Sequence, residues 1–181
     1  MKLLIASDLH GSAYYTRLLL ERFKEEKCDR ILLLGDILYH GPRNDLPRDY
    51  APKEVIALLN PLSDIIDCVR GNCDAEVDQM VLNFPIMADY KKLTVNGLNL
   101  YATHGHVYNG EKPMRMRRDS IMLLGHTHVP MIEKHESFTC LNPGSIAIPK
   151  DGSVPSYLIL EERRFSFRKL EDNQEYQFYQ A

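Results

Sequence analysis

The sequence has no long apolar run and no large excess of charge of either sign. No apolar stretch approaches the roughly 20 residues that a bilayer-spanning helix needs, so we expect no membrane segment. Its 22 lysines and arginines against 25 aspartates and glutamates give a formal net charge of −3. Because this balance provides no overall basic field, we expect neither nucleic acid nor an anionic membrane as a partner.

Cysteine is scarce, and its spacing excludes several kinds of site. The chain has four cysteines, Cys28, Cys68, Cys73 and Cys140. They form no CxxC pair and match no zinc-finger spacing, so we expect no structural zinc. The first apolar run meets Asp8 and His10 too early to be the core of a signal peptide. We therefore expect reduced thiols and a cytoplasmic protein.

The order of the apolar runs predicts the fold class of the first half. A length of 181 residues with 44% apolar and 26% charged residues is typical of one soluble domain, here residues 1–181. The expected elements are buried strands at 2–7, 30–34 and 65–69, alternating with helices at 12–27 and 52–59. This β-α-β-α-β order predicts parallel pairing with right-handed crossovers.

The second half has a different pattern. Short strands are predicted at 93–95, 98–103, 121–124, 131–134, 138–141, 157–160 and 165–168. Asn96-Gly97 predicts a type I′ turn between the first two of these strands. We therefore expect an α/β fold, a mixed sandwich with a largely parallel first half and an antiparallel second half.

Five polar clusters follow predicted strands, where open α/β sheets place their sites. The clusters are Asp8-Leu9-His10, Gly35-Asp36, Gly71-Asn72, His104-Gly105-His106 and Gly125-His126-Thr127-His128. In Asp8-x-His10 and His126-x-His128, a two-residue step on extended backbone would place both side chains on one side. Six of the seven histidines lie in or near these clusters. A histidine in any one cluster could be structural, but five such clusters together indicate one site.

The clusters offer more ligands than one metal ion needs. The candidates are two aspartates, one asparagine and four histidines: Asp8, Asp36, Asn72, His10, His104, His126 and His128. A single zinc normally takes four ligands, so seven suit two divalent ions that share a carboxylate. Oxygen and nitrogen donors without a thiolate favour Mn²⁺, with Fe, Zn or Ni as alternatives. Two such ions can clamp an in-line displacement at phosphorus and generate hydroxide at neutral pH.

The order D-x-H, GD, GN, H, GHxH resembles that of the calcineurin-like metallophosphoesterases. The strings GDxxxHGPRN, RGNCDxEVDQM and NPGSxxIPK are similar to those of the small bacterial YfcE-type phosphodiesterases. The resemblance extends from Asp8 to past Pro149. It implies a four-layer αββα sandwich of two mixed β-sheets flanked by helices, a small phosphodiester substrate and a homo-oligomer.

The resemblance also implies a role for each ligand. Asp8, His10 and His128 would hold one metal ion. Asn72, His104 and His126 would hold the other, and Asp36 would bridge the two. A hydroxide that bridges both ions would attack phosphorus, with Asp36 and Asn72 closest to the reaction.

One residue departs from the pattern of many family members. They follow GN with a histidine that can protonate the leaving oxygen, whereas this chain has Cys73. A thiol with an ordinary pKa of about 8.5 is a poor substitute for imidazole at pH 7. Alkyl monoesters depend on that proton more than activated diesters do, so we expect a phosphodiesterase.

Three further residues each have a functional and a purely structural interpretation. Arg43 either binds a phosphate oxygen over the metals or lies in solvent, and its long loop favours the first. His40 either orients the substrate or donates a proton, or it only caps its loop. His106 either hydrogen-bonds a metal ligand or lines the rim of the pocket.

Three other segments are given simpler interpretations. Arg115-Met116-Arg117-Arg118 is expected to be a solvated face, because no interleaved aromatic residues accompany it. Asn142-Pro143-Gly144-Ser145 is expected to be a turn. The tail with Tyr176, Phe178 and Tyr179 could dock on the body or on a second subunit.

Three alternative functions remain at this stage. A phosphomonoesterase or protein phosphatase is disfavoured by Cys73 and by the short chain. A non-catalytic metal-binding scaffold of the same fold predicts damaged ligands, yet all seven positions carry metal-competent side chains. A nuclease is disfavoured by the acidic net charge.

Overall fold

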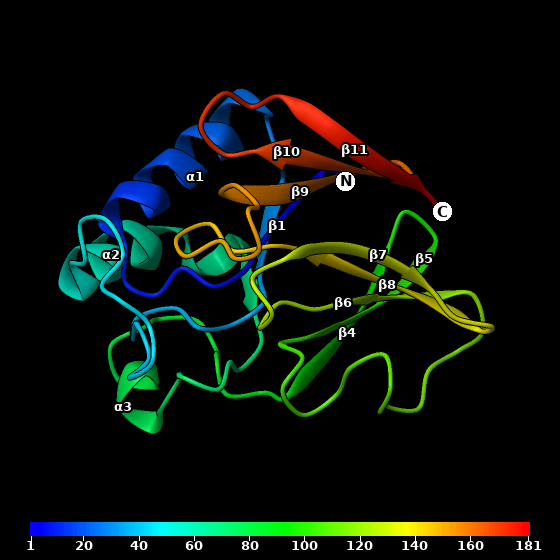
Figure 1. Cartoon of the computed structure of the whole chain (residues 1–181), viewed down its shortest axis with the longest axis horizontal. Helices are drawn as coiled ribbons and strands as arrows, with labels where there is room; N and C mark the ends of the chain where they lie inside the picture. The colour runs from blue at the N-terminus through cyan, green and yellow to red at the C-terminus, as the bar shows by residue number, and fades with distance from the viewer.

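The computed structural model describes residues 1–181 and contains two mixed β-sheets packed face to face (Figure 1). The first sheet has the strand order β11-β10-β9-β1-β2-β3. Its strands are β1 (Leu3–Ala6), β2 (Arg30–Leu33), β3 (Ile66–Cys68), β9 (Ser156–Glu161), β10 (Arg164–Lys169) and β11 (Glu175–Gln180). The strands β1, β2 and β3 pair in parallel, which confirms the prediction for the first half.

The second sheet has the strand order β4-β5-β6-β8-β7. Its strands are β4 (Tyr90–Val95), β5 (Leu98–Thr103), β6 (Ser120–Leu123), β7 (Pro130–Lys134) and β8 (Phe138–Pro143). Asn96 and Gly97 both have positive φ, as a type I′ turn requires. The prediction of an antiparallel second half was wrong for β5-β6 and β6-β8, which pair in parallel. Residues 104–119 connect the end of β5 to the start of β6. This crossover is long enough to bring the chain back along the sheet, so that β6 can run parallel to β5.

Helices cover the outer face of the first sheet (Figure 1). They are α1 (Ala13–Glu25), α2 (Pro52–Leu59) and the 3₁₀ helix η1 (Asn60–Ile65), whereas the short α3 (Glu76–Gln79) lies apart from this sheet and has no buried residue. The Ser12 side chain accepts a hydrogen bond from the Tyr15 N–H and caps α1, while Pro52 occupies the first turn of α2. Both helix starts agree with the sequence prediction.

Three apolar layers hold the molecule together. One lies between the helices and the first sheet, and the second lies between the two sheets. The third lies outside the second sheet, where Tyr108, Met114 and Met116 pack on Tyr101 and Met122. The predicted α/β sandwich of two mixed sheets is confirmed. The outer cover of the second sheet is an irregular segment rather than a helix, because side chains of residues 108–116 already bury that face.

The C-terminal tail docks on its own chain. It forms the edge strand β11, paired antiparallel with β10. The Tyr179 hydroxyl lies 3.0 Å from Thr139 Oγ1 of the second sheet, and Arg164 pairs with Glu175. Of the two interpretations of the tail, the structure therefore shows docking on the body.

The strand directions explain where the polar clusters lie. β1, β2 and β3 are parallel, and β5 and β6 are parallel within the facing sheet. Each of these strands is followed directly by one polar cluster, so the clusters meet at one edge of the sandwich. None of the helices has both the length and the apolar character that a membrane crossing demands.

Candidate metal centre

The carboxylate of Asp8 is fully buried and only half satisfied. Its Oδ2 accepts hydrogen bonds from the Ser7 hydroxyl at 2.6 Å and the His126 backbone N–H at 3.1 Å. Its Oδ1 has no hydrogen-bond partner. That oxygen lies 3.2 Å from His128 Nε2 and 3.6 Å from His10 Nε2. A buried, unpartnered carboxylate oxygen facing imidazoles is what a cation site requires.

Backbone carbonyls orient the imidazoles of His10 and His128. His10 Nδ1 donates to the Tyr39 carbonyl at 2.8 Å, and His128 Nδ1 donates to the Ile148 carbonyl at 2.6 Å. Each neutral ring therefore presents the lone pair of Nε2 to the site. The two Nε2 atoms are only 3.2 Å apart. Two facing lone pairs repel each other unless a proton or a cation lies between or beside them.

A second group forms around Asp36 and His104. His104 Nδ1 donates to the Leu34 carbonyl at 2.6 Å, and its Nε2 lies 3.5 Å from Asp36 Oδ2 and 3.1 Å from Asn72 Oδ1. Asp36 Oδ2 is also 3.8 Å from His10 Nε2. Asp36 therefore lies between the two groups of histidines, which is the position that a shared ligand needs.

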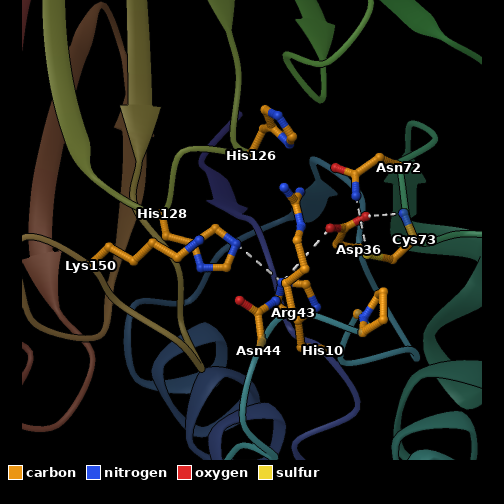
Figure 2. Close-up of a pocket in the computed structure, with 11 residues that line it drawn as sticks. His10, Asp36, Arg43, Asn44, Asn72, Cys73, His126, His128 and Lys150 are labelled. Atoms are coloured by element: carbon orange, nitrogen blue, oxygen red, sulfur yellow. Dashed lines mark hydrogen bonds and ion pairs between the residues drawn. The ribbon is translucent and has the colours of Figure 1, made fainter.

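His126 stands apart from these groups. Ligand atoms of Asp8, His10 and His128 lie within 4.8 Å of one another, as do those of Asp8, Asp36 and His104. His126 belongs to neither set, although it lines the same cleft (Figure 2). No hydrogen bond holds its ring, so the ring can turn towards Asn72 and His104 without breaking one.

The charges of Asp8, Asp36 and His104 shift the pKa values of one another. Burial alone would raise the pKa of Asp8, but the charge of His104 and the neighbouring imidazoles of His10 and His128 hold the pKa well below its ordinary value. Burial also opposes the charge on His104, yet Asp8 and Asp36 raise the pKa of His104 to about 9.

The backbone of the site is unusual. Five of the seven candidate ligands have left-handed backbone with positive φ: Asp8, His10, Asp36, His126 and His128. The prediction that Asp8-x-His10 and His126-x-His128 are extended was therefore wrong. The paired side chains still face one site because left-handed residues turn the chain at each ligand. Hydrogen bonds from the Asp8 N–H to Gly35 and from the His10 N–H to Asp36 fix this conformation.

Asp74 organises the ends of two strands and was missed by the sequence analysis. It is 2% exposed, and its carboxylate accepts hydrogen bonds from the N–H groups of Asp36, Ile37 and Gly71 at 2.7–2.9 Å. These bonds lock the loop after β2 to the loop after β3. An aspartate next to a candidate site gave a weak signal, but its three backbone partners could not be read from the sequence.

Asn142 and Ser145 do more than form the expected turn. Asn142 Nδ2 donates to the Gly125 carbonyl at 2.8 Å and to Thr127 Oγ1 at 3.0 Å. The Ser145 hydroxyl donates to the Asp8 carbonyl at 2.8 Å. The end of β8 and the segment after it thus support both the Asp8 turn and the turn that carries His126 and His128.

Glycine is required where the clusters approach each other most closely. A Cβ atom at Gly71 would overlap Asp36 Oδ1, and one at Gly125 would overlap Ser7 Oγ. The strands can therefore bring their loops together only without a side chain at these two positions.

The candidate ligands open into a cleft of about 320 Å³. Arg43, Asn44 and Lys150 line it together with His10, Asp36 and His128. Figure 2 shows Arg43 extending between His128 and Asn72 in this view, with Lys150 on the side of His128. Lys150 was not among the predicted site residues, although it ends the string NPGSxxIPK, because that string does not indicate that its last residue reaches the cleft.

The structure does not bring His40 to the cleft. Its ring lies between Tyr39 and Tyr50, with ring centroids 4.7 and 5.1 Å away. Its carbonyl accepts a hydrogen bond from Asn44 Nδ2 at 2.8 Å. This arrangement favours the loop-capping interpretation.

His106 and Cys73 flank the ligands. The His106 ring centroid lies 5.4 Å from that of His104 and 6.2 Å from that of His126, and it donates to neither. Cys73 lines the cleft, and its N–H donates to Asp36 Oδ1 at 2.8 Å. Burial, followed by the charge of Asp36, raises the pKa of the Cys73 thiol to about 12.

Comparisons with known proteins agree with this arrangement. The family model of the calcineurin-like phosphoesterase superfamily domain matches residues 1–164. Phosphodiesterase YfcE of Escherichia coli strain K12 is 42% identical over 172 residues, which cover 95% of this chain and 94% of that protein. A solved structure of YfcE, a phosphoesterase from E. coli, matches with a TM-score of 0.96 and 40% identity over 99% of both chains. Vacuolar protein sorting 29 of Cryptosporidium parvum shares the fold, with a TM-score of 0.66 and 17% identity over 99% of this chain and 98% of that one.

The two groups of ligands predict that divalent cations stabilise the fold. Mn²⁺ should raise the free energy of unfolding of metal-stripped protein, by about 2.7 kcal/mol at a free concentration 100 times its dissociation constant. Asp8→Asn should remove most of this gain, while Asp64→Asn at an exposed position should keep it. Urea unfolding with and without Mn²⁺ measures both. An Asp8→Asn protein that responds to Mn²⁺ as the wild type does would contradict the assignment.

The buried hydrogen bonds of Asp74 predict a second effect on stability. In Asp74→Asn, one acceptor oxygen becomes an N–H₂ group that faces backbone donors, so at least one buried N–H loses its partner. Metal-free Asp74→Asn should lose about 1–3 kcal/mol of unfolding free energy. Asp64→Asn should stay within about 0.5 kcal/mol of the wild type. Equal stability of the two variants would show that the three bonds contribute little.

Proposed function

Because the chain belongs to the calcineurin-like phosphoesterase superfamily, we propose that it is a phosphodiesterase that uses two divalent metal ions, most simply Mn²⁺. The observation that supports this most directly is Asp8 Oδ1, which is buried, lacks a hydrogen-bond donor and faces the Nε2 atoms of His10 and His128. A single protein domain over residues 1–181 and a cytoplasmic location are part of the proposal. Four free cysteines are consistent with that location.

The donor set fits two ions. Asp8, His10 and His128 would hold the first, and Asn72, His104 and His126 the second. Asp36 would be shared, as its Oδ2 lies 3.8 Å from His10 Nε2 and 3.5 Å from His104 Nε2. When bound, two such ions supply Lewis acidity and a hydroxide at neutral pH.

The residues of the chain have distinct tasks in this proposal. The carbonyls of Tyr39, Leu34 and Ile148 fix the imidazole tautomers, so that each Nε2 faces the site. Arg43 supplies two parallel N–H donors for phosphate oxygens, and Lys150 adds a second positive charge at the mouth of the cleft. Together they hold the substrate phosphorus over the ligands.

The preference for diesters depends on residue 73. Cys73 lines the cleft beside Asn72, and no imidazole occupies the position. His106 does not line the cleft, and His40 lies away from it. A monoester with a poor leaving group therefore has no imidazole in place to protonate the leaving oxygen. A diester with an activated leaving group needs that proton less.

Turnover of matched substrates tests the proposal. Metal-stripped protein refilled with Mn²⁺ should hydrolyse bis(4-nitrophenyl) phosphate at least tenfold faster than 4-nitrophenyl phosphate, and chelation should abolish both activities. Arg43→Ala should lower kcat/KM for the diester, because it removes a bidentate phosphate contact. Faster turnover of the monoester would contradict the diester preference. No turnover of either substrate with metals bound would favour a non-catalytic scaffold.

Replacing the thiol tests the leaving-group argument on its own. Cys73→His should raise turnover of an alkyl monoester, whose leaving group is poor, by about tenfold or more, since a positioned general acid contributes about 10²–10⁴-fold. Cys73→Ser is the matched control and should leave the monoester rate near that of the wild type. An unchanged monoester rate in a folded, metal-loaded Cys73→His protein would remove the argument.

A further inference from the structure

A second, apolar groove lies beside the metal cleft. It has a volume of about 440 Å³ and is formed by α2, α3 and the segment that follows β2, which lie together on one side of the molecule (Figure 1). Apolar and aromatic side chains line most of it, among them Tyr39, Tyr50, Ile56, Val77 and Val81. The side chain of Val77 is 62% exposed and that of Val81 is 42% exposed. Exposed apolar side chains gathered around a concavity of this size are typical of a ligand site.

The groove and the cleft meet at a low ridge. Cys73 is the one residue that lines both. Gly41 packs against it, since a Cβ atom at Gly41 would lie 3.2 Å from Cys73 Sγ. The Cys73 thiol thus lies at the boundary of the two spaces, with Gly41 and the Asn72 side chain beside it. A molecule held in the cleft by a phosphate can therefore extend over the ridge into the groove.

The two sides of the ridge differ in charge. The cleft carries the candidate metal ligands together with Arg43 and Lys150. The groove contains no lysine, arginine or histidine, and its single charged residue is Asp78, whose carboxylate accepts a hydrogen bond from the Ala75 N–H at 2.9 Å. The groove would repel a second phosphate or carboxylate of a substrate. The rings of Tyr39 and Tyr50 suit a flat, uncharged group.

We propose that this groove binds one ester substituent of the diester substrate, an uncharged aromatic group, while the phosphate occupies the cleft. The proposal rests on the proposed phosphodiesterase function. In the reaction, one phosphorus–oxygen bond breaks, water adds to phosphorus, and the departing oxygen takes a proton that comes from the water. The substrate class is thus a phosphodiester with an aromatic alcohol on one side and no further negative charge on that side.

Two substitutions on or next to α3 distinguish an effect of charge inside the groove from an effect of charge elsewhere on the surface. Val77→Asp places a charge in the groove, whereas Met80→Asp places the same charge at an 84% exposed residue outside it. Neither residue lines the cleft. With bis(4-nitrophenyl) phosphate, one aryl group must enter the groove whichever group departs. Val77→Asp should raise KM at least fivefold with kcat within twofold of the wild type, and Met80→Asp should change neither value by more than twofold.

A binding measurement keeps this test independent of catalysis. 2-Naphthol, followed by its own fluorescence, should bind metal-stripped wild-type protein and Met80→Asp, and bind Val77→Asp at least fivefold more weakly. With Mn²⁺ present it should inhibit diester hydrolysis competitively in the first two proteins. Binding of 2-naphthol without any diester hydrolysis would overturn the proposed function but support an aromatic site in the groove.

Two results would overturn the groove proposal itself. The first is an equal response of Val77→Asp and Met80→Asp in both KM and 2-naphthol binding. The second is a wild-type dimer that Val77→Asp dissociates in sedimentation velocity while KM stays unchanged. That second result would make the groove an interface between two copies of the chain.

Discussion

The hydrogen bonds of Asp8 join the two sheets, and the rest of the site depends on them. Its N–H donates to the Gly35 carbonyl at the end of β2, and its carbonyl accepts from the Ser145 hydroxyl after β8. Its carboxylate accepts from the His126 N–H of the second sheet. These bonds cross between segments distant in sequence. The free oxygen of Asp8 therefore reaches its position only when both sheets have packed, so the site forms with the fold and not before it.

This arrangement has a cost in backbone strain. Non-glycine residues with left-handed backbone each cost about 1–3 kcal/mol, and ligands in both sheets adopt it, among them Asp8, Asp36 and His128. Asp74 offsets part of this cost through its three backbone hydrogen bonds. The buried supports of the site thus maintain a backbone shape that the ligands would not adopt alone. That shape lets residues two positions apart face the same site.

Features that depend on local sequence, such as helix starts, were predicted correctly. Features that depend on contacts between residues distant in sequence were not. Ser12 and Pro52 marked the starts of α1 and α2 because capping and the fixed φ of proline act within one turn. The ligand candidates were recognisable because each follows an apolar strand. The parallel pairing of β5 with β6 was not, since strand direction depends on the path of residues 104–119 over the sheet. The support given by Asn142 to Gly125, 17 positions away, has no local signature either.

Residue 73 connects acid catalysis with the space available to the substrate. It lines both the charged cleft and the apolar groove, and Gly41 packs beside it on the ridge. An imidazole there could donate a proton to a leaving oxygen, but its ring is larger than a thiol and would raise the ridge. A cysteine keeps the passage open and gives up an efficient acid. On the proposed function, these two consequences favour the same substrates: diesters whose leaving group needs little protonation and whose aromatic substituent needs the room.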